Sequence, residues 1–71
     1  MNKLLELRKK YRYTRSELSR VSGVNESEIY KLEKGLLDFR NCKLNTIIAL
    51  SQAFGLKGVA ILPTEIRNEM L

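Results

Sequence analysis

The sequence predicts an all-α protein, a compact bundle of four to five helices. Short segments with a helical spacing of apolar residues follow one another along the chain, and residues typical of helix ends bound most of them. The chain has only 71 residues, which allows a single small core. Together these observations favour short helices packed around one interior.

The first expected helix covers about residues 2 to 10. Leu4, Leu7 and Tyr11 fall on one face, and three basic residues lie in the last turn, where the helix dipole favours positive charge. A second helix is expected after Thr14, because Thr14 and Glu17 have the spacing of a capping box.

The second and third helices are expected to lie close together in the chain. Leu18 and Val21 form the inner face of the second helix, and Gly23 ends it. The third begins only two residues later, at Asn25, with Ile29 and Leu32 facing inward. Two short helices joined by a tight turn that contains glycine are the signature of a helix-turn-helix unit.

A connector over residues 36–43 and a fourth helix over about residues 44–54 complete the predicted bundle. In the connector, Leu36, Leu37 and Phe39 either cover the core or form an exposed contact patch, and covering the core is favoured. The apolar stripe of the fourth helix consists of Leu44, Ile47, Ile48, Leu50 and Phe54. The chain is accordingly divided into a domain over residues 1–56 and a C-terminal tail over 57–71, expected to form a short helix that packs on the core or on a dimer partner.

The charge distribution indicates a polyanionic partner. The net charge is +5, and residues 1–43 hold eleven Lys and Arg against six Asp and Glu, whereas residues 44–71 hold two of each sign. Positive charge confined to one part of a chain is typical of nucleic-acid binding, although small basic proteins often carry it only for solubility.

Several classes of function are disfavoured by the residues that the chain lacks. Cys42 is the only cysteine and there is no histidine, so neither a Cys/His metal cluster nor an internal disulfide is expected. No nucleophile–base pair or glycine-rich phosphate loop is present, which argues against an enzyme, and no cofactor is expected. No apolar run is long enough to span a membrane and the first residues do not resemble a signal peptide, so the expected location is the cytoplasm.

From Leu4 to Leu56 the chain resembles the Xre/Cro-like phage-repressor helix-turn-helix family. The resemblance rests on residues at fixed spacing: Thr14 to Ser19, then Gly23-Val24-Asn25, Ile29, Glu33-Lys34-Gly35, and Leu50 to Gly55. It implies a small DNA-binding transcriptional regulator, of which a repressor is the favoured kind. It also implies an ion pair between Arg8 and Glu33. The sequence departs from the family at Arg12, where glycine is usual, at Arg15, where glutamine is usual, at Ser19, where alanine is usual, and in the longer connector.

In such proteins the second helix of the motif lies in the major groove, which makes residues 26–34 the expected recognition helix. The positions that match the family's base readers are Glu26, Ser27, Tyr30 and Lys31. Phosphate contacts are expected from residues that flank this helix or open the second one: Arg15, Ser16, Lys34, Arg40, Asn41 and Lys43. The carboxylates of Glu26 and Glu28 argue against this prediction, because both would lie close to phosphates.

A monomer of this size offers a small interface with DNA, so a homodimer on two half-sites is expected. The tail supplies the apolar candidates for the dimer contact: Val59, Ile61, Leu62, Ile66, Met70 and Leu71. Some of these side chains could instead close the core of the monomer. The competing hypothesis is a protein-interaction module on the same fold, an antitoxin or adaptor that binds a protein partner through the loop 36–42 and the tail.

Overall fold

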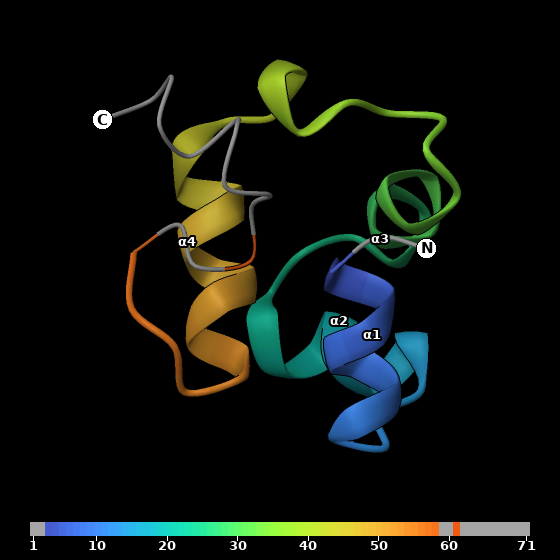
Figure 1. Ribbon diagram of the computed structural model, residues 1–71, viewed down its shortest axis with the longest axis vertical. Coiled ribbons are helices and arrows are strands. Elements are labelled where there is room, and N and C mark those ends of the chain that lie inside the picture. Colours follow the sequence, from blue (N-terminus) through green and yellow to red (C-terminus); the bar gives the residue numbers. More distant parts are fainter. Residues whose placement is uncertain (1–2, 59–60, 62–71) are drawn as a thin grey trace.

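The structure is a computed structural model that describes residues 3–58 and residue 61. Within these residues the chain forms α1 (Lys3–Lys10), α2 (Arg15–Ser22), α3 (Glu26–Lys34), the short 3-10 helix η1 (Phe39–Asn41) and α4 (Leu44–Ala53), with no strand. The predicted all-α class is therefore confirmed. In Figure 1, α4 stands on one side and α1 and α2 on the other, while the segment after α3 crosses the top of the molecule.

The helix-turn-helix unit is built by local signals at the ends of α2 and α3. The Thr14 hydroxyl accepts a hydrogen bond from the Glu17 amide (3.0 Å), and the Glu17 carboxylate accepts one from the Thr14 amide (2.9 Å). Gly23 ends α2 with a φ of +76°, a left-handed conformation that costs glycine little. Asn25 then caps α3 by accepting a hydrogen bond from the Ser27 amide (2.8 Å). These caps explain how two short helices begin and end so close together.

The core lies where α2 packs against α3 and α4 and where α1 packs against α3. Its members are buried apolar side chains contributed by every helix, by the turn between α2 and α3 and by the segment after α4: Leu4, Leu18, Val24, Ile29, Leu32, Phe39, Ile47, Leu50, Phe54 and Ile61. Tyr11, expected on the inner face of the first helix, follows the end of α1 and is largely exposed, with its ring 5.4 Å from that of Phe54. Burial of these side chains is the main source of stability in so small a chain.

The prediction for the inner face of α2 was partly wrong, because Val21 is 51% exposed. The side of α2 that packs is formed by Leu18 together with the half-buried Arg15, Ser19 and Ser22. These residues lie three or four positions apart and therefore share one face, while Val21 lies on the flank beyond Leu18. The hydroxyl of the half-buried Ser19 has a hydrogen-bond partner, because it donates to the Val24 carbonyl (2.6 Å).

The connector between α3 and α4 divides into a buried and an exposed part. Phe39 is buried and Leu37 packs against the core, as the favoured interpretation expected, but Leu36 is 71% exposed. Leu44 was expected in the apolar stripe of α4 and is also largely exposed. It occupies the first position of α4, before the turn in which the helix reaches the core.

The core continues beyond Leu56, because Ile61 is fully buried. Ile61 was a candidate for the dimer contact, and this assignment was wrong, since a side chain closed inside the monomer is not available to a partner. The other five candidates, Val59, Leu62, Ile66, Met70 and Leu71, lie outside the described residues. The division of the chain at residue 56 remains a prediction.

Candidate nucleic-acid interface

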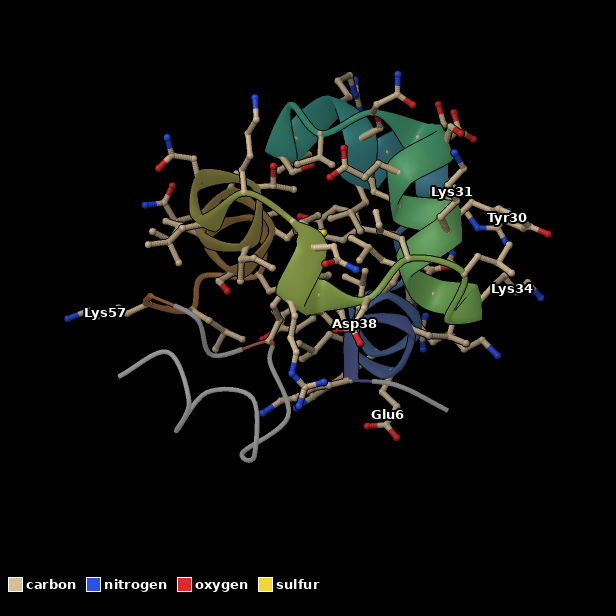
Figure 2. All side chains as sticks on the ribbon, turned by 90° about the horizontal axis from the view of Figure 1, so that it is seen from above. Glu6, Tyr30, Lys31, Lys34, Asp38 and Lys57 are labelled. Carbon is tan, nitrogen blue, oxygen red and sulfur yellow. The ribbon has the colours of Figure 1, made fainter. Side chains whose placement is uncertain are left out.

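The outer face of α3 carries the residues predicted to read bases. Glu26, Ser27, Tyr30 and Lys31 are exposed, as is Lys34 one turn further on. The opposite face of the same helix holds Ile29, Leu32 and Glu33, which are buried. Figure 2 shows Tyr30 and Lys34 projecting from α3 away from the rest of the bundle. The structure thus brings the predicted base-reading residues together on one accessible helix face.

Glu33 anchors α3 to the two preceding helices. The Nε and Nη2 atoms of Arg8 donate to the two carboxylate oxygens of Glu33, the second over 3.2 Å, and Nη1 of Arg8 donates to the Tyr13 carbonyl (3.0 Å). The ion pair that the family resemblance implied is therefore present. Only 1% of the Glu33 side chain is exposed, so this carboxylate depends on its partners for stabilisation.

Arg15 also binds Glu33, which its sequence position did not lead us to expect. Its Nε donates to a Glu33 carboxylate oxygen over 3.1 Å. The Arg15 guanidinium lies over the ring of Tyr30, with Cζ 4.8 Å from the ring centroid, and the ammonium group of Lys34 is 5.9 Å from the same centroid. A residue predicted to contact phosphate is thus already bound to two residues of α3. The side chain nevertheless remains 35% exposed, which leaves it within reach of solvent.

The remaining residues predicted to contact phosphate lie on two segments. Ser16 is exposed in the first turn of α2, close to the backbone amides that a helix N-terminus offers to anions. Arg40, Asn41 and Lys43 are exposed on η1 and at the start of α4, and Arg40 lies 3.5 Å from the carboxylate of Asp38. Asp38 caps the N-terminus of η1, because its side chain accepts a hydrogen bond from the Arg40 amide (2.8 Å).

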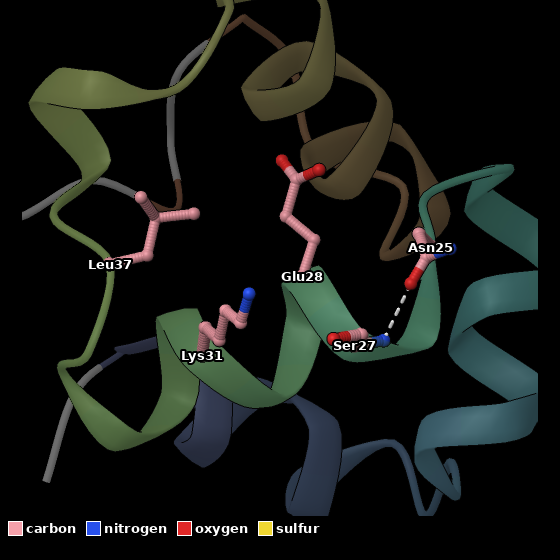
Figure 3. A pocket seen from close by; sticks show the side chains of 5 residues that line it. All are labelled: Asn25, Ser27, Glu28, Lys31 and Leu37. Atoms are coloured by element: carbon pink, nitrogen blue, oxygen red, sulfur yellow. Dashed lines mark hydrogen bonds between the residues drawn. The ribbon is translucent and has the colours of Figure 1, made fainter.

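A shallow hollow of about 370 Å³ lies between α3 and the connector (Figure 3). Asn25, Ser27, Glu28, Lys31 and Leu37 line it, and Figure 3 shows the side chains of Glu28 and Lys31 pointing into it. The sequence had suggested neither this hollow nor the position of Leu37 in its wall, because the path of the connector depends on tertiary packing. The carboxylate of Glu28 therefore places a negative charge beside the exposed face of α3.

Cys42 lies beside this region and is partly buried. Partial burial, together with the nearby carboxylates of Glu28 and Asp38, raises the pKa of its thiol. The thiol also lies 3.8 Å from the Asp38 carbonyl oxygen, to which it can donate.

In the described part of the chain, no cluster of three or more potential metal ligands is found. Among those same residues, none of the helices has the length and apolarity needed to cross a membrane.

A capped pair of helices around a glycine turn, with the second helix presenting polar and basic side chains outward, defines a helix-turn-helix DNA-binding protein. Comparison with protein families agrees: a family model described as helix-turn-helix, of the Xre-like type, matches residues 4–61. The chain belongs to this family, which is a DNA-binding regulatory family and is not generally enzymatic. No curated protein and no solved structure matched the chain.

Proposed function

We propose that this regulator binds double-stranded DNA in a sequence-specific manner by placing residues 26–34 in the major groove, and that it acts as a repressor. The observation that carries the proposal is the exposed face of α3, where Tyr30 and Lys34 project outward (Figure 2) and the exposed Lys31 lines the adjoining hollow, while the other face of the helix is buried. An α-helix that is anchored on one side and polar on the other fits the width of the major groove.

Within this proposal the exposed side chains of α3 have different roles. Lys31 donates to guanine O6 and N7, and Glu26 accepts from cytosine N4, which turns a carboxylate beside phosphates into a means of discrimination. Ser27 tolerates several bases. Ser16, Lys34, Arg40, Asn41 and Lys43 bind phosphates and set the register of the helix, with Arg15 contributing its exposed end.

A homodimer in the cytoplasm completes the proposal. Two copies on half-sites about 34 Å apart would give the affinity that one small interface lacks. Excluding Ile61, the dimer contact would involve Val59, Leu62, Ile66, Met70 and Leu71. Sedimentation of the protein at tens of micromolar, with and without operator DNA, tests this part separately from DNA recognition.

The central experiment selects binding sites from random duplex DNA at near-physiological salt for the wild type, Lys31→Ala and Lys57→Ala. Lys57 is exposed and lies far from α3 in Figure 2, so its replacement removes the same charge away from the proposed interface. We expect an enriched motif that loses its preference at one or two base pairs in Lys31→Ala, by about 5- to 100-fold, and is retained in Lys57→Ala. The absence of an enriched motif for the wild type would contradict the proposal.

One observation favours a second function, a protein-interaction module on the same fold. Leu36, in the loop that follows α3, is 71% exposed and would be accessible to a protein partner. Salt separates the two functions. DNA binding through several lysines and arginines weakens steeply as salt rises, whereas an apolar protein contact does not.

A further inference from the structure

Arg15 connects the buried interior of the helix-turn-helix unit with its exposed recognition face. Its Nε donates to Glu33 over 3.1 Å, and the Cζ atom of its guanidinium lies over the Tyr30 ring, 4.8 Å from the ring centroid. One side chain of α2 therefore contacts both the anchored side and the exposed side of α3. A lysine could not make both contacts in this way, because its ammonium group is a point charge without a plane to stack.

The Glu33 end of this arrangement is fixed. The carboxylate of Glu33 is 1% exposed and is held by Arg8 of α1 through both of its oxygens. Arg15 is therefore bound to a group that is itself immobilised by another helix. The orientation of the Arg15 guanidinium is consequently determined by the core of the protein and not by solvent.

The Tyr30 ring, by contrast, lies at the surface, where a neighbouring group is needed to fix its orientation. Tyr30 is 40% exposed, and two cationic groups lie against its ring, the guanidinium of Arg15 and the ammonium group of Lys34. A ring at the surface would otherwise exchange between side-chain rotamers. Cation–π contact with a fixed guanidinium favours one of them, and stacking of this kind is strongest when the cation is already partly removed from water.

We propose that Arg15 is a positioning residue for base recognition, which holds the Tyr30 ring in the orientation that contacts the C5-methyl group of a thymine. This inference rests on the proposed function. A rigid aromatic edge in the major groove finds one apolar group there, the thymine methyl, and a mobile ring would lose most of that contact. Arg15 thus contributes to sequence preference through Tyr30, in addition to any phosphate that it binds.

The first test uses the free protein and needs no DNA. The variants are Arg15→Lys and, as a matched control on the same helix, Arg20→Lys, whose side chain is exposed. In the NMR spectrum of the wild type and of Arg20→Lys, we expect one Tyr30 rotamer and ring-current shifts on the Arg15 δ-methylene protons. In Arg15→Lys we expect averaged Tyr30 couplings with an unchanged fold elsewhere. A single Tyr30 rotamer retained in Arg15→Lys would overturn the positioning role.

The second test removes only the methyl group of the DNA. Sites selected by the wild type are resynthesised with deoxyuridine in place of each thymine in turn. At one position we expect the wild type and Arg20→Lys to lose about 3- to 5-fold in affinity, the contribution of one buried methyl group. Arg15→Lys, Tyr30→Ala and the double variant should each show less than about 2-fold discrimination there, without additivity.

The outcomes separate this inference from the function on which it rests. If the wild type enriches no motif, both the proposed function and this inference are overturned. If the wild type enriches a motif and Arg15→Lys keeps the thymine–uracil discrimination, only the inference is overturned. Loss of discrimination in Tyr30→Ala alone would assign the reading of the methyl to Tyr30 without help from Arg15, and would also overturn it.

Discussion

Arg8 in α1 and Glu33 in α3 form an ion pair in which two nitrogens of the guanidinium donate to the two oxygens of the carboxylate. The pair joins residues 25 positions apart and is almost closed to solvent, with 14% of the Arg8 side chain and 1% of the Glu33 side chain exposed. A third donor of Arg8 holds the Tyr13 carbonyl, so the same side chain also fixes the turn that leads from α1 to α2.

Removal of Arg8 should therefore destabilise the fold. We expect Arg8→Ala to lower the free energy of unfolding by about 3 kcal/mol, because it leaves a buried carboxylate with Arg15 as its remaining arginine partner. Urea denaturation followed by circular dichroism measures this. Lys9→Ala, at the exposed neighbouring position, should change the free energy by less than about 0.5 kcal/mol. Equal effects of the two substitutions would contradict a structural role for the pair.

Arg12 should be a site at which glycine stabilises the protein. Among the described residues it is the one non-glycine residue with a positive φ, +59°, in the turn after α1. A side chain in this left-handed conformation costs about 1–2 kcal/mol. The higher entropy of glycine in the unfolded chain offsets part of the relief. We expect Arg12→Gly to raise the free energy of unfolding by about 0.5–1 kcal/mol.

The control for this prediction is Arg12→Ala, which removes the same charge but keeps a Cβ atom. It should give no stabilisation. If both variants were equally stabilised, relief of charge repulsion in this basic region would be the cause, and the backbone argument would be wrong.

The capping box should make stability depend on pH. The hydrogen bonds from the backbone amide and the hydroxyl of Thr14 lower the pKa of Glu17. A carboxylate whose pKa is lower in the folded state contributes stability above its unfolded pKa, and this contribution is lost as the pH falls through the folded pKa. Glu17→Gln keeps an acceptor oxygen but does not titrate.

We therefore expect the melting temperature of the wild type to exceed that of Glu17→Gln near neutral pH, by a small amount because the group is exposed. The difference should shrink between about pH 6 and about pH 3. Thermal unfolding of both proteins across this range measures the effect. A difference that stays constant with pH would show that the charge of Glu17 contributes nothing to the cap.

Ser51 in α4 offers a second stabilising substitution. Its side chain is fully buried, and its hydroxyl has no hydrogen-bond partner within the described part of the chain. A buried hydroxyl without a partner costs about 1–3 kcal/mol. We expect Ser51→Ala to raise the free energy of unfolding by about 1 kcal/mol. Gln52→Ala, at the exposed neighbouring position, is the control for the higher helix propensity of alanine. It should raise the free energy of unfolding by less than about 0.5 kcal/mol. A gain as large as that of Ser51→Ala would contradict the prediction.

Most of the helix ends could be predicted because their signals are local. Thr14 with Glu17, Gly23 and Asn25 each act on backbone groups a few residues away, and the structure shows each of them in the expected role. The same applies to the exposed face of α3, since the spacing of Ile29 and Leu32 determines which side of this helix turns inward. Val21 and Leu44 were misassigned because spacing groups the apolar residues of a helix but does not determine how wide a face, or which of its turns, packs against the core.

The sequence by itself thus determined the helical class, the helix-turn-helix unit and the face of α3 that is available for recognition. The tertiary structure alone decided the burial of Ile61, the hollow between α3 and the connector, and the engagement of Arg15 with both Glu33 and Tyr30. The physical reason is the range of the forces involved. Caps and periodicity depend on neighbours within one turn of the chain, whereas burial and ion pairing depend on residues that only the packing of helices brings together.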